Sequence, residues 1–110
     1  MTELTDKTGT PVEIGRAGDT FTVAVEGQRV GLVQFVERDE HRVFLHTEVE
    51  PAFGGRGLAT VLITQALAAT RADGRRIVAL CPMVAAYLKE HHDFDDILDR
   101  PTREIMDSLR

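Results

Sequence analysis

Hydrophobic and polar residues alternate over three stretches in the first half of the chain, and this pattern predicts three strands. Apolar side chains occupy every second position from Phe21 to Val25. Residues 29–37 carry apolar side chains on both sides, so we expect a central strand there. A third strand, residues 41–49, ends before Pro51, because proline cannot donate to a β-ladder. Short polar turns would join the three strands into an antiparallel meander.

The pattern becomes helical after the third strand. Residues 58–71 are apolar nearly all round, which predicts a helix packed deep against a sheet, ended by Gly74. An apolar run without alternation, residues 76–81, predicts a strand covered on both faces. Two further helices are predicted at residues 83–91 and 101–109. A strand, a crossover helix and a second strand make a right-handed parallel unit.

These elements predict an α/β fold with a short, mixed, strongly twisted sheet. The long helix would cover one side of the sheet, and the later helices would lie around the other. Strict alternation in the third strand would separate its side chains into two sets. One face would hold Val43, Leu45, Thr47 and Val49, and the other Phe44, His46 and Glu48.

Length and composition place the chain among folded single domains. Its 110 residues, 43% hydrophobic and 28% charged, suit one core and one domain over residues 1–110, with residues 1–11 as a loose arm. The net charge of -5 leaves no basic stripe, so we expect no nucleic-acid partner. No stretch is apolar enough to span a membrane, and the polar N-terminus is unlike a signal peptide, so we expect a cytoplasmic protein.

Cysteine and histidine content excludes several kinds of site. A single cysteine, Cys81, allows no internal disulfide and no multi-cysteine metal site. The four histidines have no spacing typical of metal ligands, so we expect no metal. If Cys81 has a function, it acts as a thiol.

Three glycines, Gly54, Gly55 and Gly57, lie between the third strand and the long helix. Glycine lets a ligand approach the backbone closely, and unpaired N–H groups at a helix N-terminus attract anions. The stretch matches neither a P-loop nor a dinucleotide fingerprint. It therefore predicts a pyrophosphate-binding helix start, with nucleotide phosphate as one candidate ligand.

Residues 54–59, GGRGLA, resemble the acyl-coenzyme A pyrophosphate loop, [QR]xxGx[GA], of the GNAT superfamily of N-acetyltransferases. In order and spacing, HTEV, GRGLA, LCP and YLKEHHDF are similar to a minimal subgroup of short single-domain proteins with a cysteine after the fourth main strand. The resemblance covers about residues 20–98. It implies a GNAT-like sheet whose parallel pair splays apart at the cofactor. It also implies transfer of an acetyl group from acetyl-coenzyme A to an amine, whose identity as small molecule or protein stays open.

The sequence departs from the family pattern in two places. Gly54 stands where the loop usually has Gln or Arg, which removes a side chain that could contact phosphate. Only residues 26–28 connect the first two predicted strands, where larger relatives have helices over the acceptor. The acceptor side should therefore be open, with room for a homodimer. A non-catalytic coenzyme A-binding or interaction module is the alternative function.

The resemblance implies a role for individual residues. Cofactor binding would fall to Val49, Gly54, Gly55, Arg56, Gly57, Leu58, Ala59 and Thr60. Among these, the backbone N–H near Val49 would be the oxyanion donor, where the two parallel strands splay apart to admit the pantetheine arm. Arg56 and Lys89 are candidates to neutralise phosphate charge.

Four side chains are candidates for the chemistry. His46 is the leading general base, because imidazole titrates near neutral pH, unless it is a hydrogen-bonded packing residue. Glu48 is the second candidate base, or a solvated strand residue. Cys81 is either a nucleophile that takes the acetyl group or a residue that lines the site. Tyr87 resembles the tyrosine that protonates the coenzyme A thiolate, or is an aromatic residue at the rim.

Overall fold

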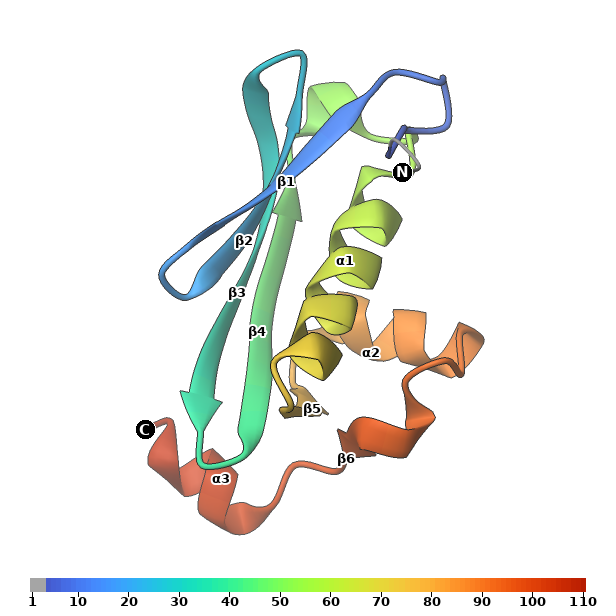
Figure 1. Cartoon of the computed structure of the whole chain (residues 1–110). Coiled ribbons are helices and arrows are strands. Elements are labelled where there is room, and N and C mark those ends of the chain that lie inside the picture. Colours follow the sequence, from blue (N-terminus) through green and yellow to red (C-terminus); the bar gives the residue numbers. More distant parts are fainter. Residues whose placement is uncertain (1–3) are drawn as a thin grey trace.

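The computed structural model describes residues 4–110 and contains one six-stranded sheet with helices packed on it (Figure 1). The strands are β1 (Val12–Ala17), β2 (Thr20–Val25), β3 (Gln28–Arg38), β4 (His41–Val49), β5 (Arg76–Ala79) and β6 (Leu98–Asp99). The α-helices are α1 (Leu58–Ala72), α2 (Pro82–Glu90) and α3 (Arg103–Ser108). Two 3-10 turns, η1 (Pro51–Phe53) and η2 (Asp95–Ile97), complete the elements.

The sheet is mixed, as predicted. Its strands lie in chain order; β1 to β4 are antiparallel, and β4–β5 and β5–β6 are parallel. The meander, the crossover helix and the return strand are therefore confirmed. Two edge strands, β1 and β6, were not predicted: in β1 the alternation of Val12 and Ile14 stops at Arg16, and β6 has only two residues.

The two faces of the sheet are covered unequally. Helix α1 buries Leu58, Leu62 and Leu67 against one face and forms the main core with residues of β2, β3 and β4. On the other face, α3 covers only the part around Val43 and Val78 through Ile105. The rest of that face lies open, which positions the site described below.

A β-bulge in β4 changes which side chains share a face. Gln34 pairs with His46 and Phe35 pairs with Phe44, so Leu45 is an extra residue without a partner on β3. Phe44 and Thr47 consequently both point toward α1 and are buried, whereas Leu45 is exposed. The predicted strict alternation along this strand was wrong, because the bulge shifts the pattern by one residue between Phe44 and His46.

The N-terminal segment is folded from Leu4 onward. The prediction of a loose arm covers residues 1–11, of which 1–3 lie outside the described residues. Residues 4–11 instead form a turn, closed by a bridge between Thr5 and Pro11 and by the Asp6 carboxylate, which accepts hydrogen bonds from the Thr8 and Thr10 N–H groups. We call residues 4–11 the N-terminal turn.

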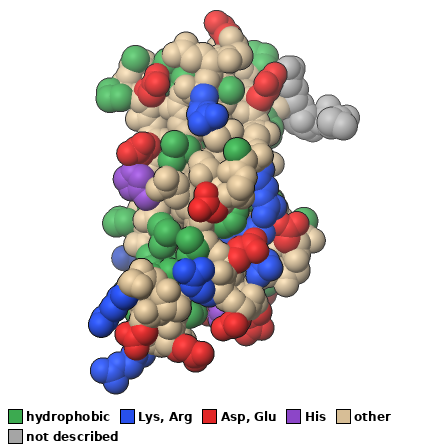
Figure 2. Space-filling model, turned by 90° about the vertical axis from the view of Figure 1, so that its left-hand side faces the viewer, with side chains coloured by type: hydrophobic (Ala, Val, Ile, Leu, Met, Phe, Trp, Pro, Cys, Tyr) green, Lys and Arg blue, Asp and Glu red, His purple; other side chains and the backbone are tan. Residues whose placement is uncertain are grey.

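The surface carries charges of both signs. On the side that Figure 2 shows, acidic and basic side chains are interspersed, and hydrophobic side chains gather only in small groups. That side offers no broad apolar patch of the kind that marks many protein interfaces. None of the helices among residues 4–110 has the length and apolar character to cross a membrane.

Candidate active site

Strands β4 and β5 part after a short parallel pairing. They pair from His41 to Phe44 only, and the N–H groups of both Leu80 and Cys81 donate to the Phe44 carbonyl. Beyond that point β4 continues along β3, while the chain after β5 turns into α2. A gap therefore opens between the upper half of β4 and the start of α2.

Backbone N–H groups of β4 point into this gap. The N–H of Glu50 donates to the Val30 carbonyl on β3 at 2.8 Å. Successive N–H groups of a strand point to opposite sides, so those of Thr47 and Val49 face away from β3. Among residues 4–110 no strand lies on that side to accept them, because β5 pairs with β4 only as far as Phe44. The predicted donor near Val49 therefore has the required direction.

The glycine-rich loop presents a continuous set of backbone donors. Gly55 and Gly57 adopt positive φ angles of 78° and 76°, and Gly57 is the residue that caps the start of α1. Within residues 4–110, the six N–H groups from Gly55 to Thr60 have no hydrogen-bond acceptor, and helical bonding begins with the Val61 N–H. Six donors at the positive end of a helix form a cradle for an anion.

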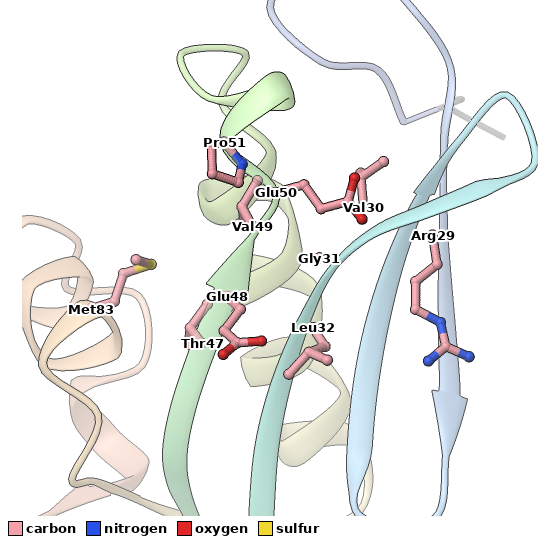
Figure 3. Close-up of a pocket in the computed structure, with 10 residues that line it drawn as sticks. All are labelled: Arg29, Val30, Gly31, Leu32, Thr47, Glu48, Val49, Glu50, Pro51 and Met83. Atoms are coloured by element: carbon pink, nitrogen blue, oxygen red, sulfur yellow. The ribbon is translucent and has the colours of Figure 1, made fainter.

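Two cavities lie beside this loop and the gap. The larger, about 560 Å³, is lined by β3 and β4 residues and by Met83 at the start of α2, which lies across the gap from β4 (Figure 3). The smaller, about 170 Å³, lies between α1 and α2, with Ala59 and Thr60 at its wall. Met83 lines both cavities. The two cavities therefore meet at Met83, one beside the strand gap and the other beside the first turn of α1.

His46 and Glu48 form a pair on the open face of the sheet. His46 Nε2 lies 2.8 Å from Glu48 Oε1, and both side chains are more than half exposed. Glu48 lines the larger cavity, and His46 lies next to it on the same face. The structure thus brings the two candidate bases together and places the glutamate at the cavity wall.

Cys81 lies apart from this pair. Its side chain belongs to the main core and is only 2% exposed, and its Sγ contacts Thr47 Oγ1 at 3.3 Å. Thr47 points to the opposite face of β4 from its neighbours His46 and Glu48. The structure therefore does not bring Cys81 and His46 together, and the sulfur lies behind Thr47 rather than in either cavity.

Tyr87 lines the smaller cavity, between the helices. Its hydroxyl accepts a hydrogen bond from Thr64 on α1 at 2.8 Å, and its ring stacks on His91 with centroids 4.4 Å apart. Thr64 has one hydroxyl proton, and its Oγ1 also donates to the Thr60 carbonyl at 2.7 Å, so the two contacts compete for that proton. Sequence reasoning missed Thr64, since only the packing of α1 on α2 shows that the two hydroxyls meet.

The two predicted phosphate cations have different surroundings. The Arg56 guanidinium is paired with Asp6, with Nε 2.8 Å and Nη2 2.7 Å from Oδ2. The Asp6 side chain has no exposed surface, and its pKa is lowered to about 2, chiefly by the Thr8 hydroxyl and further by backbone N–H groups and Arg56. Lys89 lines a third cavity, bounded by the chain around Asp99, and not the glycine loop.

The comparisons with known proteins decide the family. Residues 20–97 match the family model described as GCN5-related N-acetyl-transferase. The chain belongs to the GCN5-related N-acetyltransferase (GNAT) family. Because the match covers β2 through η2, it includes the whole of the loop, the strand gap and α2.

Solved structures agree with this assignment at the level of the fold. The GNAT domain resembles the NMR structure of a GCN5-like protein from Staphylococcus aureus, with a TM-score of 0.64 and 19% sequence identity. The match covers 83% of this chain and 91% of that one. Among curated proteins, none matches the sequence. Within residues 4–110, no group of three or more His, Cys, Asp or Glu residues could hold a metal ion.

Proposed function

We propose that this GNAT domain transfers an acetyl group from acetyl-coenzyme A to an amine by direct attack. The observation that carries the proposal is the run of six unpaired N–H groups from Gly55 to Thr60, together with the two cavities that meet at Met83 beside the strand gap. The N–H groups suit the charged diphosphate of the cofactor, and the strand gap suits its reactive thioester. Family membership supports this chemistry.

The backbone would hold the cofactor at two points. The N–H groups from Gly55 to Thr60 would bind the diphosphate, and Gly55, where an added Cβ would meet nothing within 4 Å, leaves room for its oxygens. The pantetheine arm would pass Met83 between α1 and α2 and enter the gap beside β4. There the Val49 N–H would donate to the thioester carbonyl oxygen and stabilise the negative charge that develops on it.

Side chains would carry out two proton transfers. The amine nitrogen forms a bond to the carbonyl carbon, the carbon–sulfur bond breaks, and the sulfur leaves as a thiolate. The pair of Glu48 and His46 would accept the proton that the amine loses, with Glu48 the member at the cavity wall. Tyr87 would donate its proton to the thiolate, while Thr64 holds its hydroxyl in place.

A non-catalytic coenzyme A-binding module remains the competing function. The open face beside His46 supports it, because no element of the described part of the chain covers the side from which an acceptor would approach. Acetyl-coenzyme A incubated with the protein and a panel of amines, including lysine peptides and diamines, separates the two. We expect one acetylated amine and an equal amount of free coenzyme A. Binding without transfer to any amine would support the module, and no binding at millimolar concentration would refute both.

Replacement of Cys81 is expected to leave transfer intact. A thiol that is 2% exposed behind Thr47 does not reach the gap, so direct attack does not need it. For Cys81→Ala, with the wild-type protein as control, we expect the same rate and no acetylated cysteine in the mass spectrum after incubation with acetyl-coenzyme A. An acetyl adduct on Cys81 in the wild-type protein, with the rate abolished in the variant, would establish a covalent route instead.

Replacement of Glu48 is expected to slow transfer without weakening coenzyme A binding. Glu48→Gln removes the proton acceptor at the cavity wall but keeps its size, and we expect a loss of about ten- to a hundredfold in kcat/KM. His46→Gln should cost a similar factor, and the double variant no more than the worse single one, since the two act as a unit. Losses that multiply in the double variant would show that the residues act separately.

A further inference from the structure

The N-terminal turn packs against the glycine loop, although the two segments are far apart in the sequence. The Lys7 N–H donates to the Arg56 carbonyl at 2.8 Å, beside the double contact between Asp6 and the Arg56 guanidinium. The Asp6 carboxylate is fully buried by these contacts. A backbone hydrogen bond, an ion pair and the burial of the Asp6 side chain therefore hold the turn against the loop.

The contact with Asp6 neutralises the positive charge of the loop. Arg56 is the only basic residue within the loop, and Asp6 neutralises it. The usual polar residue at the first loop position is replaced by Gly54. A diphosphate on the six N–H groups would thus find no uncompensated cation in the loop itself.

Lys7 lies where such a cation is needed. A Cβ atom built on Gly57 would lie 3.0 Å from Lys7 Cγ and 3.2 Å from Cε, so the lysine stem runs across Gly57 at the start of α1. Lys7 is exposed and has no ion-pair partner among the described residues. Its ammonium group is carried to the edge of the N–H cradle by a stem that lies against the loop.

We propose that the N-terminal turn is part of the cofactor site and that Lys7 supplies the cation that binds the diphosphate. The proposal rests on the proposed coenzyme A site and adds a segment outside the family-matched residues 20–97. Asp6 serves as the positioning residue, because its pairing with Arg56 fixes the turn on the loop. The ammonium and the backbone N–H groups then bind the same phosphate oxygens from two sides.

The test uses the two lysines of the chain. Titration calorimetry would compare the wild-type protein with Lys7→Ala, Lys7→Arg and the control Lys89→Ala, using coenzyme A, dephospho-coenzyme A and pantetheine. We expect Lys7→Ala to weaken binding of the first two ligands about tenfold, Lys7→Arg to restore most of it, and Lys89→Ala to bind as the wild type. Pantetheine, which has no phosphate, should bind all four proteins equally.

A second readout needs no variant. In the wild-type protein, coenzyme A should protect Lys7 but not Lys89 from an amine-reactive ester, as read by peptide mass spectrometry. Normal binding by Lys7→Ala, or a defect that disappears with dephospho-coenzyme A, would overturn the assignment to the diphosphate. Failure of the wild-type protein to bind coenzyme A would instead refute the proposed function, and with it this site.

Discussion

Gly55→Glu is expected to weaken coenzyme A binding at least about a hundredfold, because it removes several charge-assisted hydrogen bonds. The new carboxylate would lie over the N–H groups of the loop and repel the diphosphate. A Cβ atom at Gly55 meets nothing within 4 Å, so the substitution causes no packing clash. The positive φ of 78° costs the variant about 1–2 kcal/mol of stability, which leaves the fold in place.

Gly18→Glu is the matched control for this variant. Gly18 also has a positive φ, 60°, and nothing within 4 Å of a Cβ atom, but it lies in the turn between β1 and β2. The control makes the same change of charge and a similar backbone strain. Calorimetry should show undiminished coenzyme A binding for Gly18→Glu. Equal losses in the two variants would mean that general charge or strain, not the cradle, is responsible.

Arg42→Ala is expected to lower the free energy of unfolding by about 3 kcal/mol. Arg42 is 1% exposed, its Nη2 lies 2.7 Å from Glu37 Oε1 and 2.9 Å from Asp73 Oδ2, and its guanidinium lies 4.9 Å from the Phe35 ring. It joins β4 to β3 and to the end of α1, three residues before the bulge at Leu45. Truncation would leave a cavity and would remove the buried one of the two arginines, Arg42 and Arg16, that pair with both carboxylates.

Solvent limits the loss of stability in Arg42→Ala. Glu37 and Asp73 are 34% and 40% exposed, so water replaces part of the lost interaction. Urea unfolding followed by circular dichroism measures the effect. Arg103→Ala, an exposed arginine at the start of α3, is the control and should change stability by less than about 0.5 kcal/mol. Equal stability of the Arg42 and Arg103 variants would show that the buried network contributes nothing.

The strands, the long helix and the glycine loop could be predicted because each has a local signal. Alternating apolar and polar residues indicate β2, and apolar side chains on nearly all sides indicate α1. Glycines at 55 and 57 indicate positive φ angles. The parallel unit followed from the order of the elements. Each of these features depends on residues that are close together in the sequence.

The parts that could not be predicted depend on contacts across the fold. The bulge at Leu45 leaves no trace in the alternation, yet it decides that Thr47 points toward Cys81 and His46 away from it. The pairing of Asp6 with Arg56 joins residues 50 positions apart. The polar composition of the N-terminal turn predicted a loose arm. Its polar residues instead bond to one another and to the loop, and these contacts leave no periodic pattern in the sequence.

The central claim is that the unpaired N–H groups of the loop and of β4 hold coenzyme A. The most direct measurement is a ¹H–¹⁵N NMR titration of the protein with coenzyme A. We predict that the largest amide shifts occur in residues 55–60 and at Thr47 and Val49. The amide of Lys7 should shift together with those of the loop. Large shifts confined to the cavity beside Lys89, with the loop amides unmoved, would contradict the account.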